Sequence, residues 1–455
     1  MRFPLPRNLS LIAGAALLSV FPAAAQTNLE TNAGIEFNFS TPGASNLARG
    51  GAFLALADDA TTAYTNPAGL TNLFDPEVSL EVRSWRFTHV FTDRGRREGQ
   101  EPTDRGVDTL AGLRDGEASN EVTGISFLSY VYPREKIAVA IYRHELVSFE
   151  ADFETQGAFL EETNQTRGPL GLPGVDDGRL ASLRNRMRLD VESFGLSAAY
   201  RFGPGLSLGL GLAYFDFSLD SRADRFVPPF FEAPDFRPEK VVSFQTQRGD
   251  DSDWGIRAGF LWTSDNRLIS VGGAFRQGAD FAVLAESRNG PASPAGFAEK
   301  ETPSRFNIPD VYGLGIALRL TASFQITFDY DRVEYSDLKD GLVDIFGLDG
   351  LIPGLDPETG SFRIDDADEL RLGFESSLLK LRFPISLRYG VWYDPDHTLR
   401  FEGENSSLRT VFRPRDDEFH LSFGVGLPRE RFQLHAGVDV SDRVTTAALS
   451  TVLRF

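Results

Sequence analysis

From about residue 76 onward, hydrophobic and polar positions alternate along the chain with a period of two. The alternation is clearest over 381–394, 418–427 and 431–440, where apolar side chains on one face oppose charged residues and glycines on the other. A period of two indicates β-strands that have one apolar face. We predict fourteen strands, near residues 77–92, 121–133, 136–151, 188–203, 205–221, 240–263, 267–286, 309–319, 322–335, 366–378, 381–394, 417–427, 431–441 and 443–455.

The connections between the predicted strands alternate in length. Tight turns are expected at 132–135, 203–205, 264–266, 320–321, 379–380 and 428–430. Long loops are expected at 93–120, 152–187, 222–239, 287–308, 336–365 and 395–416, and only the short connection at 441–443 departs from the rule. Short turns on one side and long loops on the other are typical of outer-membrane barrels, whose turns lie in the periplasm.

The character of the two strand faces separates a membrane barrel from a soluble β-sandwich, which would also alternate. The polar face carries charges and glycines in mid-strand, as expected of a wet lumen, and the apolar face is rich in aromatic residues near strand ends. A barrel in hydrocarbon must close, because an open edge leaves backbone groups unsatisfied. The sequence therefore predicts an all-β fold, a transmembrane antiparallel β-barrel of about 14 strands.

Residues 1–25 have the pattern of a secretory signal peptide, with Arg2 and Arg7 before an apolar centre and small residues before Gln26. A short membrane anchor is the alternative. The chain of 455 residues has no Cys, which excludes disulfides and thiol catalysis, and its net charge of -19 argues against nucleic acid as a partner. No mature stretch approaches the roughly 18 apolar residues of a spanning helix.

Residues 26–75 do not follow the strand pattern. The part from Ala48 to Tyr64 is rich in Ala and Gly and has apolar residues at helical spacing, so we predict a helix that Pro67 ends. Fourteen strands enclose a lumen wider than wall side chains can fill, because eight strands already leave only a small interior. We therefore predict that 26–75 is a hatch, or plug, inside the barrel formed by residues 76–455.

Two stretches of this segment, Ala48–Ala60 and Asn66–Leu70, resemble the N-terminal hatch of the FadL/TodX family of outer-membrane transporters. Residues 308–315 and 387–394 are also similar to that family. The resemblance implies a fourteen-stranded barrel with a hatch in its lumen and passive uptake of long-chain fatty acids or other hydrophobic compounds. The family's hatch triplet carries over only to Asn66, Pro67 and Ala68. The same motif is also similar to PorV-type barrels, so a structural or protein-secretion barrel stays the alternative.

No catalytic pattern is present, and we expect neither an enzyme nor a cofactor or metal site. By parity Arg371 and Arg388 fall on the lumen face, where a guanidinium could bind the carboxylate of a ligand bidentately. The alternative is that they pair with lumen acids such as Glu369 or Asp394. Apolar clusters in two long loops are candidates for ligand capture, namely Phe159, Leu160, Phe226, Phe230 and Phe231.

The expected partners follow from the barrel. They are a hydrophobic ligand, outer-membrane lipids and lipopolysaccharide, and the outer-membrane assembly machinery, which a terminal aromatic such as Phe455 would address. Acidic residues where strands re-enter from the long loops, such as Asp366 and Asp417, could hold divalent cations that bridge to lipopolysaccharide phosphates. Plain solvated charge is the alternative for this acidic rim. The expected location is the bacterial outer membrane.

Overall fold

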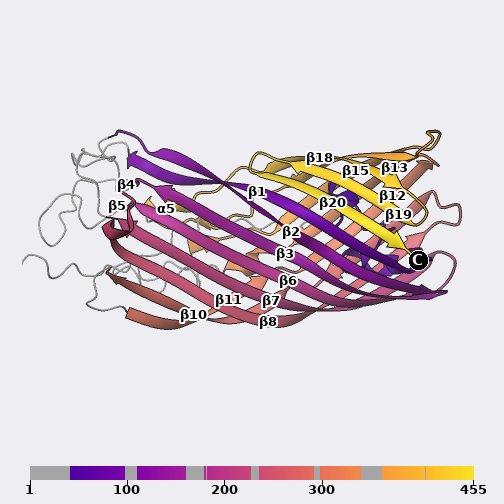
Figure 1. Ribbon diagram of the computed structural model, residues 1–455, viewed down its shortest axis with the longest axis horizontal. Coiled ribbons are helices and arrows are strands. Elements are labelled where there is room, and N and C mark those ends of the chain that lie inside the picture. Colours follow the sequence, from indigo (N-terminus) through magenta and orange to yellow (C-terminus); the bar gives the residue numbers. More distant parts are fainter. Residues whose placement is uncertain are drawn as a thin grey trace, which may run out of the picture.

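The computed structural model describes residues 41–97, 110–159, 179–180, 182–226, 235–291, 298–339, 361–404 and 406–455. The predicted signal peptide and the first part of the hatch, residues 1–40, lie outside these ranges. The described chain forms a closed antiparallel barrel of fourteen strands (Figure 1), which confirms the predicted fold class.

The wall consists of β1 (Glu77–Arg96), β2 (Arg114–Arg134), β3 (Ile137–Thr155), β6 (Leu183–Arg201), β7 (Leu206–Phe226), β8 (Val241–Thr263), β9 (Ile269–Arg276) continued by β10 (Ala279–Pro291), β11 (Ala298–Ile308) continued by β12 (Val311–Thr321), β13 (Phe324–Val333), β15 (Ala367–Leu378), β16 (Ile385–Asp394), β18 (Glu418–Pro428), β19 (Phe432–Val440) and β20 (Val444–Arg454). The barrel closes where β1 pairs with β20 over eleven residues, from Glu77 opposite Arg454 to Phe87 opposite Val444. Short elements lie at the loop end, namely β4 (Gly157–Phe159), β5 (Arg179–Leu180), β14 (Phe362–Arg363), β17 (Arg400–Phe401), η3 (Pro238–Lys240), η4 (Tyr335–Asp337) and α5 (Ser406–Val411).

The wall strands β1, β2, β3, β6, β7 and β8 are about twice as long as a membrane crossing needs, since roughly 9–11 residues span the bilayer. Along β7 the outward residues are apolar from Leu206 to Tyr214 and polar from Asp216 to Asp224. The inward residues change in the opposite sense, from Ser207 and glycines to Phe215, Phe217 and Leu219. The polarity of the two faces therefore inverts near Tyr214. The long strands continue beyond the apolar band, and Figure 1 shows them reaching furthest at the end opposite the C-terminus.

The inner face of this extension is an apolar cup, which corrects the expectation of a wet lumen for that half of the barrel. Phe217 lies between Phe281 and Phe306, with ring centroids 5.1 and 4.9 Å away. The apolar cup is formed by buried side chains of β3, β6, β7, β10 and β11: Phe149, Phe153, Met187, Leu189, Phe215, Phe217, Leu219, Phe281 and Phe306. Sequence alternation alone did not reveal the inversion, because a period of two continues unchanged across it.

The wall is interrupted between β8 and the next strand. The β8–β9 ladder ends where Arg257 is opposite Arg276, and pairing of β8 with β10 resumes only at Arg248. Between these points the carboxylates of Asp251 and Asp253 accept hydrogen bonds from the backbone N–H groups of residues 282 and 280, at 2.7 and 2.8 Å. Carboxylates therefore replace part of the missing ladder.

The interruption also corrects two predicted boundaries. The single strand expected over 267–286 is divided into β9 and β10, and most of the loop expected over 287–308 is strand, because β11 pairs with β10 along its whole length. The neighbouring break between β11 and β12 falls at Pro309, which cannot donate a ladder hydrogen bond.

Residues 41–75 form a plug that contacts opposite sides of the ring. Its helix α2 (Ala44–Leu47) packs on β18, β19 and β20, whereas η1 (Pro67–Asn72) packs on β6, β7 and β8. The long helix predicted over Ala48–Tyr64 is wrong, because Gly50 and Gly51 have φ angles of 66° and 78° and the helix resumes only as α3 (Thr62–Thr65). No helix in the described ranges is long and apolar enough to cross a membrane.

Candidate functional site: the plug and the lumen above it

Glycines on the wall let the plug backbone lie directly against it. A Cβ added at Gly390 would lie 2.3 Å from the carbonyl carbon of Arg49, and one at Gly209 would lie 2.3 Å from the backbone nitrogen of Ala68. Eight wall strands each contribute a glycine whose added Cβ would lie within 2.6 Å of a backbone or side-chain atom of the plug, and we call the set the glycine collar: Gly209, Gly259, Gly272, Gly313, Gly373, Gly390, Gly424 and Gly437. Any larger residue there would overlap the plug, so wall and plug are shaped to each other.

The hatch triplet lies where the plug meets β7 and β8. The Asn66 amide donates hydrogen bonds to the carbonyl oxygens of Leu54 at 2.8 Å and Phe260 at 3.1 Å. Its Oδ1 accepts from the backbone N–H of Ala68 at 3.2 Å and so caps η1, which Pro67 begins. One side chain thus joins two parts of the plug to the wall, a role that an ordinary turn residue would not fill.

Buried charges anchor the other side of the plug. The carboxylate of Asp329 on β13 accepts hydrogen bonds from the backbone N–H groups of Phe53 and Leu54, at 2.6 and 2.8 Å. Arg49 of the plug forms a 2.7 Å ion pair with Glu375 of β15. Because a buried charge is costly unless it is paired, separating plug and wall would leave Arg49 and Asp329 without these partners.

The two candidate cations predicted from parity both lie in the lumen, where acids and the plug surround them. Arg371 pairs with Glu369 and lies 3.4 Å from Asp331. Arg388 forms a 2.8 Å ion pair with Glu375 and contacts the ring of His435. The pairing that the sequence left open as an alternative is therefore present for both residues.

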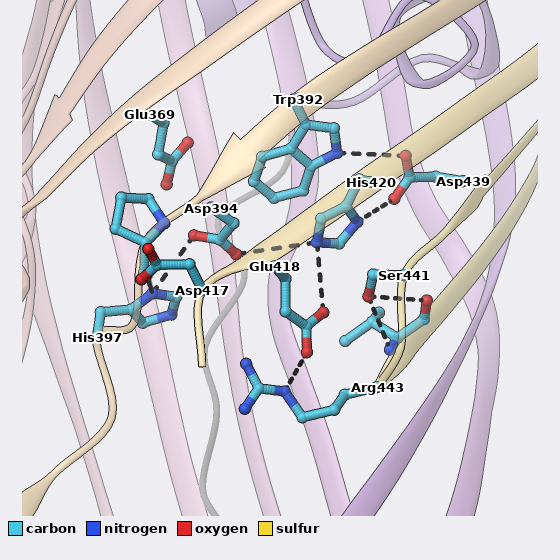
Figure 2. Close-up of polar contacts among 12 residues, drawn as sticks. Glu369, Trp392, Asp394, His397, Asp417, Glu418, His420, Asp439, Ser441 and Arg443 are labelled. Atoms are coloured by element: carbon cyan, nitrogen blue, oxygen red, sulfur yellow. Dashed lines mark hydrogen bonds and ion pairs between the residues drawn. The ribbon is translucent and has the colours of Figure 1, made fainter. Parts of the chain in front are cut away.

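A polar cluster continues from these pairs toward the loop end of the lumen (Figure 2). His420 of β18 hydrogen-bonds Asp439 through Nδ1 at 2.6 Å and stacks on Trp392, with ring centroids 3.9 Å apart. Its Nε2 lies 3.7 Å from Glu418 and 4.0 Å from Asp394. Within the described ranges no group of three His, Asp or Glu side chains is arranged to hold a metal ion.

Segments from the long loops fold over the apolar cup. Tyr335 of η4 stacks on His397, with centroids 3.9 Å apart, and donates a hydrogen bond to Glu369 at 3.3 Å. Burial raises the pKa of the Tyr335 hydroxyl well above its ordinary value, so it remains neutral and can donate. Further loop residues join the same apolar cluster, namely Leu338, Phe362, Phe401 and Phe412. The cup is closed on this side by side chains that do not belong to the wall.

Of the residues predicted to capture ligand, only Phe226 has a described side chain. It ends β7, is buried, and packs edge-on against Phe236 with ring centroids 5.1 Å apart. Leu160, Phe230 and Phe231 lie outside the described residues, as does the side chain of Phe159. Capture by these loops stays a prediction.

A small cavity lies at the base of the cup, beside the interrupted wall. Its volume is about 10 Å³, close to what one water molecule needs. Tyr64 of the plug forms one side, and the wall contributes Leu146, Phe215, Arg257, Arg276, Gln277, Gly278, Ile308, Pro309 and Val311. Sequence reasoning missed Arg257 and Arg276, although parity along β8 would have placed Arg257 inside.

No protein-family model and no curated protein sequence matches the chain. Among solved structures, a FadL homologue from Pseudomonas aeruginosa is similar at a TM-score of 0.61 and 15% identity, covering 92% of this chain and 100% of the other. The toluene transporter TodX of P. putida is similar at 0.57 and 14% (92% and 99% covered), and the CymD monoaromatic hydrocarbon channel at 0.52 and 17% (92% and 99%). These neighbours are channels and transporters rather than enzymes. The chain therefore has the barrel fold that the FadL homologue and the hydrocarbon channels share.

Proposed function

We propose that this protein is a channel of the bacterial outer membrane that takes up hydrophobic molecules passively, with long-chain fatty acids as the leading class. The observation that carries the proposal is the apolar cup, which extends beyond the membrane band and ends on the plug. A wet pore gives an apolar solute no favourable surroundings, whereas an aromatic interior removes its surface from water. The similar solved structures, which include a monoaromatic hydrocarbon channel and a toluene transporter, support the same function.

The route would begin at the loop end of the barrel. A ligand would displace the loop side chains that close the cup, because these are not tied into the wall ladder. The cup side chains pack against one another in the resting state, so the ligand would exchange aromatic contacts rather than fill an empty space. Movement of the plug away from the glycine collar would then open the way to the periplasm.

Membrane lipids, lipopolysaccharide and the assembly machinery are part of the same proposal. The suggested cation bridge to lipopolysaccharide has weaker support, because rim acids have other partners. Asp366 and Asp368 pair with Arg332 at 2.8 and 3.0 Å, and Asp417 accepts a hydrogen bond from Tyr393 at 2.5 Å.

The test compares uptake of radiolabelled oleate by cells that lack their own fatty acid channel and express folded barrels at equal amounts. Wild-type protein should raise uptake, and Phe217→Asp should abolish most of the gain because it buries a charge within the aromatic stack. Phe217→Leu is the matched control and should keep uptake. If cells that express the wild-type barrel take up neither oleate nor toluene, the structural or protein-secretion alternative of the PorV kind is favoured instead.

A further inference from the structure

Two neighbouring turns carry four exposed cations at the end of the barrel where the C-terminus lies (Figure 1). The β15–β16 turn contains Lys380 and Arg382, and the β18–β19 turn contains Arg429 and Arg431. The turns are adjacent because β16 pairs with β18. Within the described ranges none of the four side chains forms an ion pair, although the whole chain has a net charge of -19. These turns therefore concentrate unneutralised positive charge on an acidic protein.

Exposed apolar side chains alternate with the cations in the first of these turns. Leu379, Leu381 and Phe383 are 53%, 47% and 53% exposed. Turns that face water are usually built from small polar residues, as is the β8–β9 turn at 264–267. The outward apolar row of β16, which includes Leu387, instead continues into the β15–β16 turn. This turn therefore lies at the boundary between hydrocarbon and headgroups, where aromatic rings and long cationic side chains gather.

The ring of Phe383 brings one cation from each turn to the same place. The guanidinium carbon of Arg429 lies 4.6 Å from the ring centre, and that of Arg382 lies 5.5 Å from it. The ring face attracts both cations but carries no net charge that could neutralise them. Guanidinium groups bind phosphate oxygens through paired, charge-assisted hydrogen bonds. Two guanidinium groups beside one exposed aromatic ring therefore fit an anion that is attached to an apolar body.

We propose that the turns at 379–384 and 428–431 form a binding site for the phosphate headgroup of an anionic phospholipid. Arg382 and Arg429 would hold the phosphate, and the exposed apolar side chains of the first turn would contact the acyl chains. The occupant is a lipid rather than an acidic soluble protein, because those apolar side chains need hydrocarbon as well as a counter-charge. Glu430 is the one acidic residue in the two turns. The site concerns how the barrel is held in its membrane, and so goes beyond uptake.

The experiment measures lipid binding to the purified, folded barrel by native mass spectrometry. The probes are dimyristoyl phosphatidylglycerol, which is anionic, and the zwitterionic phosphatidylcholine with the same acyl chains. Wild-type protein should bind the anionic lipid more tightly. Arg382→Gln combined with Arg429→Gln should weaken that binding about 25-fold, about fivefold for each cation at a headgroup, and leave phosphatidylcholine binding unchanged. An unchanged melting temperature would show that this double variant is folded.

The matched control is Arg267→Gln combined with Arg319→Gln, which makes the same change of charge at the same end of the barrel. It should leave the affinity for phosphatidylglycerol nearly unchanged. Equal losses in the two double variants would overturn the inference, because a diffuse positive field would then attract the lipid. Displacement of the lipid by an equal concentration of glycerol phosphate would also overturn it and indicate a site for free phosphate esters. Equal binding of the two lipids by wild-type protein would overturn it as well and leave an acidic soluble protein as the partner.

Discussion

The glycine collar gives the sharpest prediction, at Gly390. A Cβ there would lie 2.3 Å from the carbonyl carbon of Arg49 and 2.4 Å from the nitrogen of Gly50, both of them plug backbone atoms. Ordinary contact begins at 3.4 Å, so in Gly390→Ala the plug must move by about 1 Å. Backbone cannot rotate away as a side chain does, and overpacking of this kind typically costs about 1–3 kcal/mol. The shift would also strain the 2.7 Å ion pair between Arg49 and Glu375.

We expect Gly390→Ala to fold as a barrel but to hold its plug loosely. Conductance in planar bilayers should show more frequent openings to small ions than wild-type protein, and intact cells should admit more of a small hydrophilic dye. The control is Gly203→Ala in the turn between β6 and β7, where an added Cβ meets nothing within 4 Å. If Gly390→Ala and Gly203→Ala behave alike, the plug is not fitted to the collar and the reasoning is refuted.

Three further predictions concern the hatch, the lipid face and the topology. Asn66→Ala removes the hydrogen bonds to the carbonyl oxygens of Leu54 and Phe260 and should weaken the attachment of the plug by about 1–3 kcal/mol. The conductance should rise while the melting temperature of the barrel stays the same, and an unchanged conductance would contradict this. Phe423→Arg puts a charge on a half-exposed outward position and should cost about 2–4 kcal/mol in lipid, whereas Phe423→Leu should cost far less; equal denaturant midpoints would contradict the face assignment. Tags inserted at about residues 170 and 350 should be reachable from outside intact cells, and a tag at Pro428–Glu430 should not. The reverse labelling would show that the barrel has the opposite orientation in the membrane.

Apart from β9 to β11, most strands of this chain could be predicted to within a few residues because one lipid face forces a period of two. The predicted strand 366–378 is β15, Ala367–Leu378, and 240–263 is β8. The inversion of the faces beyond Tyr214 kept that period and so was not predicted. It depends on where the membrane ends, which alternation does not record.

The candidate site could be predicted less well because its parts come from distant strands. The hatch triplet was found by resemblance, but the partner of Arg49 is 326 residues away and the opposed arginines of β8 and β9 depend on register. The interruption of the wall depends on where the pairing between β8 and β10 resumes. In the sequence it was indicated only by Gly278, between β9 and β10, and by Pro309, between β11 and β12. The predicted plug helix failed at Gly50 and Gly51, where the backbone adopts left-handed φ angles.

The glycine collar also has a consequence for the order of assembly. The plug is the first described part of the chain to be synthesised, yet the collar glycines that it contacts lie on strands from β7 to β19, which are synthesised later. It therefore cannot reach its final position until those strands have joined the ring. The seam between β1 and β20 needs the last strand of the chain, so it would close around the plug. The plug is thus synthesised early but is among the last parts to reach its final position, and a plug that arrives after closure would have to enter through one mouth of a finished barrel.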